Sequence, residues 1–267
     1  MKCIFVYLSL IFLLSSCGAN EVSYNDVFVL KFEEGSSVKY EFHSEQDQEM
    51  YISLSDTSEN QRMIIIVDGV QELKGLSEDE ASICLYNMSS KMTTYHGGEE
   101  HTQTMDEDHD LENDMPGLKP NGKVDGISGM NAFEMIFALP ANDLQLGESV
   151  EDEVLFPLNL GGKSSGITGL RSITYERDTL IDKEDCAVLV WKVETKGLEN
   201  KAILTPDSHG TFEALGICYF DKKRGEYAGA KSELKLDGSI ELIEKTDFVE
   251  GMWFMMKTKS TCWRKND

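Results

Sequence analysis

The chain has 267 residues, of which 40% are apolar, and it carries 48 acidic against 25 basic residues for a net charge of −23. This excess of negative charge argues against nucleic acid as a partner, because phosphate binding needs clustered Lys and Arg. It disfavours electrostatic docking on anionic lipid for the same reason. The length is enough for one large domain or two small ones, and the apolar fraction is ordinary for a globular protein with a real core.

Residues 1–16 have the order of a secretory signal peptide. Lys2 gives a positive start, an apolar run covers Ile4–Leu14, and the run is too short to cross a bilayer as a mature helix. The sequence Leu14-Ser15-Ser16-Cys17 resembles the bacterial lipobox. The resemblance implies that Cys17 is lipidated, with palmitate among the acyl chains, and becomes the new N-terminus.

The residues after the lipobox predict a tether and a location. Residues 17–26 are small, polar and acidic, which predicts a flexible tether between the membrane and the domain. Gly18 follows Cys17 in place of the Asp that marks inner-membrane retention in enteric bacteria. We therefore expect an exported protein, lipid-anchored in the cell envelope, in the outer membrane more than in the inner one.

From residue 27 onward the chain predicts strands separated by turns. Val27–Phe32 and Val38–Phe42 alternate around a Gly/Ser turn, which predicts a hairpin. The other predicted strands are Glu41–Ser55, Gln61–Val70 with a turn at Asp68-Gly69, Ser82–Tyr86, Lys91–Tyr95, Lys123–Ser128, Gly147–Phe156, Leu170–Leu180, Ala187–Val193, Gly210–Phe220, Glu226–Leu236, Ser239–Glu244 after a turn at Asp237-Gly238, and Val249–Thr258. Asn159–Gly169 predicts a loop or a weak strand. Strands that recur about every 10–14 residues favour an antiparallel sheet.

The segment Gly97–Asp114 has no apolar periodicity and a high density of charge, which predicts an irregular surface loop. Carboxylates with imidazole suit a divalent cation in principle, so Asp106, Asp108 and Asp110 are the metal-ligand candidates. The EF-hand spacing fails, however, because the glycine and glutamate positions counted from Asp106 hold other residues. A solvated loop is the favoured interpretation, and a calcium-binding loop is an alternative.

Asn131–Ala138 predicts a short helix that ends before Pro140. Phe133, Ile136 and Phe137 fall at i, i+3 and i+4 and form one apolar face. On a curved sheet these side chains would either line a pocket for a hydrophobic ligand or fill the core. Filling the core is the simpler alternative.

Cys84, Cys186, Cys218 and Cys262 remain once the signal peptide and Cys17 are set aside. In an oxidising exported compartment these cysteines allow two disulfides, in any of three connectivities. Burial as small hydrophobic residues is the equal alternative. No CxxC or CxH spacing occurs, so neither a redox motif nor a zinc knuckle is supported.

Turn and strand motifs carry a resemblance to a known family. They are Phe32-x-x-Gly35, Asn121-Gly122-Lys123-Val124, Leu139-Pro140, Leu146-Gly147-Glu148-Ser149 and Gly216-x-x-Tyr-Phe-Asp221-x-x-x-Gly225. Residues 27–245 thereby resemble a domain of unknown function in uncharacterised lipoproteins of Bacteroidota and Planctomycetes. Tyr-Phe-Asp-x-x-x-Gly is more distantly similar to half-barrel lipoprotein-carrier-like envelope proteins. The resemblance implies a β fold and an envelope location, and it brings no catalytic residues.

No catalytic motif is complete in the sequence. Gly162-Lys163-Ser164 lacks the first glycine of a phosphate-binding loop, because Pro157 stands at its position. No Gly-x-Ser-x-Gly occurs, and Asp207, Ser208 and His209 are adjacent, whereas triads are assembled across a fold. We therefore predict no enzyme activity and no cofactor.

The apolar segment Trp253–Met256, near the C-terminus, is either a final core strand or an exposed patch for a partner.

The predicted fold is mainly β, with a large curved antiparallel sheet or two packed half-barrels and one or two short helices. Residues 27–250 form the β-rich domain, whose halves meet near residue 140, and residues 251–267 form a tail or last strand. The leading hypothesis is a non-catalytic envelope protein with a binding or structural role. The alternative is a carrier of a hydrophobic ligand in a half-barrel pocket. The expected partners are the membrane, through the anchor, and an envelope protein or hydrophobic ligand.

Overall fold

The computed structural model describes residues 28–53, 58–96, 99–107, 115–125, 133–160, 163–199, 201–243 and 251–265. The predicted signal peptide, the tether and the lipidation site Cys17 lie outside these residues, as do Asp108 and Asp110.

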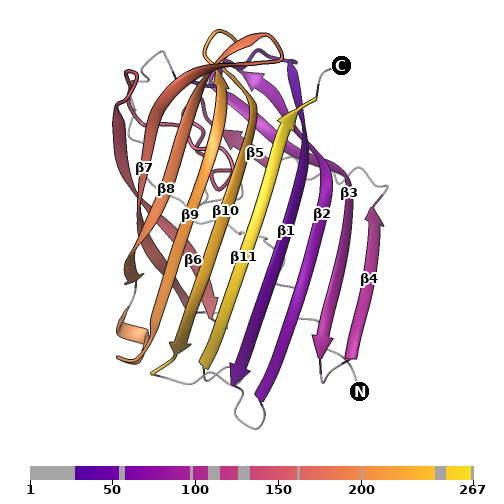
Figure 1. Ribbon diagram of the computed structural model, residues 1–267, viewed down its shortest axis with the longest axis vertical. Coiled ribbons are helices and arrows are strands. Elements are labelled where there is room, and N and C mark those ends of the chain that lie inside the picture. The colour runs from indigo at the N-terminus through magenta and orange to yellow at the C-terminus, as the bar shows by residue number, and fades with distance from the viewer. Residues whose placement is uncertain are drawn as a thin grey trace.

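The chain forms one 11-stranded antiparallel sheet (Figure 1). Its strands are β1 (Ser37–Ser53), β2 (Ser58–Ser77), β3 (Glu80–His96), β4 (Glu99–Glu107), β5 (Met115–Leu118), β6 (Ser149–Leu160), β7 (Lys163–Ile181), β8 (Glu184–Glu199), β9 (His209–Asp221), β10 (Glu226–Glu241) and β11 (Gly251–Arg264). The strand order is β4-β3-β2-β1-β11-β10-β9-β8-β7-β6, with β5 paired to β3. The mainly β prediction with one large curved sheet is confirmed.

The last strand lies in the middle of this sheet. β11 pairs with β1 on one side and with β10 on the other, so it joins the two halves of the chain. Residue 140, where the halves were expected to meet, lies between β5 and β6, which belong to opposite edges of the sheet. In Figure 1 the sheet curls so that β6 passes behind β8–β10, which makes the architecture an open half-barrel.

The two faces of the sheet differ in burial. Exposed and buried residues alternate along most of β9, with Phe212, Ala214 and Cys218 facing inward and Glu213 and Leu215 facing outward. Side chains of a strand point alternately to its two faces, so this pattern places the core on one face and solvent on the other.

A cap covers the inner face at one end of the half-barrel. We define the cap as residues 28–32, 115–125 and 133–147. Its rings pack on the sheet: Phe137 lies with its ring centroid 4.3 Å from that of Tyr227, and Phe28 meets Tyr175 edge-on at 5.4 Å. β5 lies behind the upper end of the sheet in Figure 1. The main hydrophobic core is therefore the interface between cap and sheet.

The predicted hairpin of residues 27–32 with 38–42 is wrong. Phe28, Leu30 and Phe32 are buried, so the alternation in the sequence is real, but this segment crosses the cap as non-strand backbone. Leu30 N donates to Pro120 O at 2.8 Å and Lys31 N donates to Gly225 O at 3.0 Å. Alternation shows that one face of a segment is buried, and it does not show which backbone pairs with it.

The predicted helix over 131–138 is also wrong over its described part. Ile136 N and Phe137 N both donate to Phe133 O, at 3.0 and 2.8 Å, and this turn does not continue. A segment this short gains too few helical hydrogen bonds to offset nucleation, so packing decides its conformation. In the described part of the chain, the helical element is the 3₁₀ turn Lys201–Ile203.

Several predicted breaks are continuous strand. β2 and β10 run through Asp68-Gly69 and Asp237-Gly238, and β3 joins the two strands predicted over 82–86 and 91–95. Residues 99–107, predicted as part of a loop, form the edge strand β4 against β3. The strands predicted over Gly210–Phe220 and Glu226–Leu236 are confirmed as β9 and β10, which form a hairpin whose turn ends with Gly225 at φ +69°.

Candidate functional site

Beyond the cap, we call the inner face of β1–β4, β10 and β11 the trough; its side chains range from buried, such as Gln48 and Leu236, to half-buried, such as Met63. Directly paired residues of neighbouring strands lie on the same face, so the register identifies its members. One row across the sheet runs Met63, Gln48, Met256, Leu236 and Phe212. The trough comprises Ser90, Met92, Thr94, Gln103 and Met105 on β3 and β4, Met63, Ile65 and Val67 on β2, Ser44, Gln46, Gln48 and Met50 on β1, Met252, Phe254, Met256, Thr258 and Ser260 on β11, and Ser232, Leu234 and Leu236 on β10.

Methionine is the characteristic apolar residue of the trough. Met63, Met92 and Met105 lie on β2, β3 and β4, and Met252 and Met256 lie on β11, all of them half-buried. The unbranched, polarizable thioether side chain adapts to irregular partners, and methionine is frequent on surfaces that accept varied hydrophobic ligands. These methionines are far apart in the chain and share a face only because their strands pair, so the sequence alone does not reveal them as a group.

A line of uncharged polar residues divides the trough. We call it the seam, and it consists of Ser44, Gln46, Gln48, Thr258 and Ser260 on the adjacent strands β1 and β11. The hydroxyl oxygens of Ser44 and Ser260 are 3.0 Å apart, and Gln46 Nε2 donates to Gln48 Oε1 at 2.8 Å. Gln48 is only 5% exposed. Sequence reasoning missed these residues, although polar residues in alternation with the acidic positions 45, 47 and 49 are a visible signal.

Along most of their length, the central strands β1, β10 and β11 carry their charged side chains on the outer face of the sheet. On the outer face, Arg62 pairs with Asp47 at 2.9 Å and Lys259 with Glu233 at 3.5 Å. On the inner face, residues 44–50 of β1, 230–240 of β10 and 252–262 of β11 include no charged side chain, as their register with one another shows. In a chain of net charge −23, the centre of the trough is electrically neutral.

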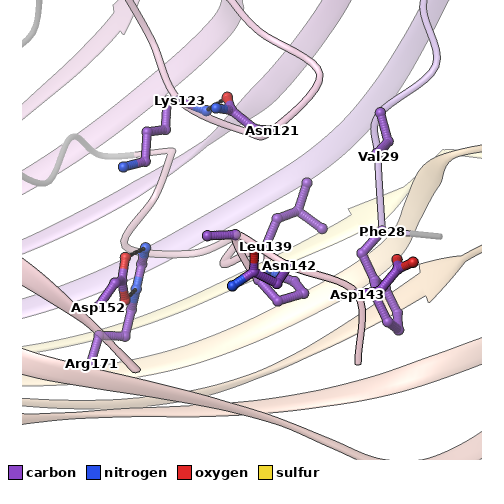
Figure 2. Close-up of a pocket in the computed structure, with 11 residues that line it drawn as sticks. Phe28, Val29, Asn121, Lys123, Leu139, Asn142, Asp143, Asp152 and Arg171 are labelled. Atoms are coloured by element: carbon purple, nitrogen blue, oxygen red, sulfur yellow. Dashed lines mark hydrogen bonds and ion pairs between the residues drawn. The ribbon is translucent and has the colours of Figure 1, made fainter. Parts of the chain in front are cut away.

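A small cavity of about 90 Å³, lined by both apolar and charged side chains, lies between the cap and the far end of the sheet (Figure 2). Arg171 and Asp152 face each other at its wall, with Lys123 and Asn121 across the space. Nε and Nη2 of Arg171 donate to the two oxygens of Asp152 at 2.9 and 2.6 Å. Burial opposes the charge of Arg171, but the hydrogen bond to Asp152 holds the pKa of the guanidinium above its usual value.

This cavity is a structural feature of the cap. Arg171 is 3% exposed, and its Nη1 has no hydrogen-bond partner among the residues that the structure describes. The cavity is large enough for a water molecule and its lining includes the polar side chains of Asn121 and Asn142, so water can satisfy such a donor. The bidentate ion pair neutralises the guanidinium, and the charges of Lys123 and Asp143 cancel, so the site has no net attraction for an anion.

The apolar residues predicted to line a ligand pocket lie within the core. Phe133, Ile136 and Phe137 are 4, 5 and 1% exposed, and Phe137 packs against both Tyr227 and Tyr40. The structure therefore corresponds to the alternative in which these side chains fill the core. The trough begins beyond them.

All four remaining cysteines are free and buried: Cys84, Cys186, Cys218 and Cys262. The structure therefore shows burial as small hydrophobic residues and not the two disulfides that the sequence also allowed. Burial raises the pKa of the Cys186 thiol to about 11 and that of Cys218 to about 12. A thiol reacts as its thiolate, so these groups are poor nucleophiles. Cys218 has a packing role, since its Sγ donates to Ile136 O at 3.3 Å and accepts from Ala138 N at 3.4 Å, which ties the cap to the sheet.

The remaining predicted sites are dispersed. Asp106 lies on β4 opposite Ser89, and a search of the described residues finds no group of His, Cys, Asp and Glu able to hold a metal ion. The segment Trp253–Met256 belongs to β11, where Phe254 faces the core and Trp253 faces outward. Over the same described residues, no helix is both long and apolar enough to cross a bilayer.

Comparison with known proteins finds no matching family model and no matching curated protein. Among solved structures, lipovitellin, in a study of lipid–protein interactions, matches 88% of this chain and 26% of its own, with 9% identity and a TM-score of 0.49. An outer membrane channel from Pseudomonas putida F1 matches 92% of this chain and 100% of its own, with 8% identity and a TM-score of 0.30. OmpF of Salmonella typhi in complex with daunomycin matches 89% and 99%, with 7% identity and a TM-score of 0.18. Such distant likenesses bear on neither ligand nor location.

Proposed function

We propose that this protein is a non-catalytic, lipid-anchored protein of the cell envelope that binds a hydrophobic ligand in the trough. The observation that carries the proposal is the composition of the inner face of β1–β3, β10 and β11, which is neutral and rich in methionine. The outer face of the same strands carries the charges that keep the domain in water.

The energetics favour an apolar occupant. Burial of apolar surface contributes about 25 cal/mol per Å², and extended apolar patches on soluble proteins mark interaction sites. Met63, Ile65 and Met92 lie side by side across β2 and β3 and are only half-buried. A ligand with flexible hydrocarbon chains would remove them from water, and methionine adapts to such chains without a fixed shape.

The proposed anchor fits this role. Ten residues lie between Cys17 and Phe28, and fully extended they reach about 35 Å. A lipid on Cys17 would keep the domain near a source of hydrophobic ligands. The net charge of −23 would keep it from adhering to anionic headgroups.

Two neighbouring methionines of β11 test the proposal. Met256 faces the trough, where it pairs with Gln48 and Leu236, whereas Met255 faces outward, and both are half-buried. We expect Met256→Glu to weaken binding of the fluorescent apolar probe N-phenyl-1-naphthylamine at least ten-fold, because it places a charge in the neutral trough. Met255→Glu should leave binding within two-fold of the parent.

Native mass spectrometry of the domain purified from its own host supplies a second readout. The proposal expects a co-purifying lipid mass in the parent and in Met255→Glu, and its loss in Met256→Glu. A bare parent mass, together with equal probe binding by both variants, would show that the trough is not a ligand site.

A further inference from the structure

We propose that the ligand of the trough is an uncharged lipid whose ester, amide or hydroxyl groups lie on the seam, with hydrocarbon on either side. This inference rests on the proposed function and adds the chemical class of the ligand. It comes from the arrangement of polar and apolar side chains across the central strands.

The trough changes polarity across the sheet where a row crosses the seam at Gln46 and Thr258. One row runs from Ile65 on β2 through Gln46 on β1 and Thr258 on β11 to Leu234 on β10. The order is apolar, polar, polar, apolar. A lipid with a polar linkage between hydrocarbon segments matches this order, whereas a plain hydrocarbon would leave the seam desolvated and unmatched.

The seam has hydrogen-bonding capacity left over. Gln48 is 5% exposed, and its Oε1 already accepts from Gln46 Nε2 at 2.8 Å. Its own Nε2 is placed against Met50 Sδ at 4.0 Å, and a thioether is a weak acceptor. A buried amide donor beside so weak an acceptor favours a carbonyl oxygen from a ligand, which accepts more strongly.

The lack of positive charge on the inner face of β1 and β11 along the seam favours neutral lipids over anionic ones. Residues 44–50 of β1 and 252–260 of β11 place no cation on the inner face. The buried guanidinium of Arg171 already forms a bidentate pair with Asp152. A phosphate or carboxylate on the seam would lose its hydration without a counter-charge, against a protein of net charge −23.

A comparison of lipids with the same chains tests the class. The purified chain is offered dioleoylglycerol, dioleoylphosphatidic acid or oleate in equal amounts, and bound lipid is counted by native mass spectrometry. We expect dioleoylglycerol to exceed both anionic lipids at least ten-fold. Equal or greater retention of the anionic lipids would overturn the inference but leave the proposed function intact, whereas no retention of any of the three would contradict the function itself.

Single substitutions test the seam. Gln48→Met keeps the volume and removes the amide, so binding of dioleoylglycerol should fall several-fold while binding of N-phenyl-1-naphthylamine stays within two-fold. Gln46→Met, at a half-buried position, serves as a second variant if Gln48→Met does not fold. Glu49→Gln, on the outer face of the same strand, is the control and should change neither ligand. Unchanged binding of dioleoylglycerol by the folded seam variant would overturn the assignment.

Discussion

Glycines stand beside some of the largest side chains on the inner face of the sheet. A Cβ built on Gly216 would lie 2.4 Å from a ring carbon of Trp191, and one on Gly238 would lie 2.7 Å from Phe254. Trp191 pairs with Gly216 across β8 and β9, and Phe254 pairs with Gly238 across β10 and β11. The missing side chain leaves the space that each ring occupies against the neighbouring strand.

This contact predicts the cost of adding a methyl group. We expect Gly216→Ala to lower the free energy of unfolding by about 1–3 kcal/mol, because Trp191 is fully packed and must shift. Urea denaturation measures the change. Leu215→Ala is the control, since Leu215 lies next in the chain, faces outward and is 55% exposed, so its loss should be near neutral. Equal stability of Gly216→Ala and the parent would contradict the close packing.

At the scale of the element, the position of a strand in the sheet decides how much of the stability of the fold depends on that strand. β11 pairs on both sides and holds the seam, whereas β4 is an edge strand that pairs with β3 on one side. Edge strands carry charge or proline that discourages further pairing. β4 begins with Glu99 and Glu100, and the opposite edge strand β6 contains Pro157.

Proline substitution at matched threonines distinguishes these positions. Thr258→Pro interrupts β11 between two partners, and we expect a loss of about 3 kcal/mol or more, or failure to fold. Thr104→Pro interrupts only the edge pair with Lys91 on β3, so its effect should be much smaller. Thermal melting followed by circular dichroism measures both. Comparable losses for the two variants would mean that β11 is not a central strand.

At the scale of the whole molecule, the proposed binding surface and the proposed anchor Cys17 consist of different residues. The first and last strands along the chain, β1 and β11, pair with each other in the middle of the sheet, and both contribute residues to the seam. The cap closes the half-barrel at one end with packed aromatic side chains. Membrane attachment and ligand binding should therefore be separable.

Replacement of the lipobox cysteine tests this separation. Cys17→Ser should move the protein from the membrane fraction to the soluble fraction, because the thiol that accepts the lipid is gone. Binding of the apolar probe should stay unchanged. Cys3→Ser, within the predicted signal peptide, is the control and should stay in the membrane fraction. If Cys17→Ser remained fully membrane-bound, the lipoprotein hypothesis would be wrong.

The sequence by itself determined the β class, most strand cores and the tight β9–β10 hairpin. Alternation and turn residues are local signals, and a segment such as Gly210–Phe220 carries them whatever its partner. The same locality explains the errors. Residues 28–32 alternate but pack in the cap, and residues 133–137 have helical spacing but form only a turn.

Only the tertiary structure decided which strands pair and hence which side chains form the proposed site. Nothing within Gly251–Arg264 says that it joins β1 to β10, because pairing is chosen by the fit of whole strands far apart in the chain. Nothing within β1 alone says that Gln46 and Gln48 continue onto Thr258. The neutral, methionine-rich trough exists only once those strands are side by side.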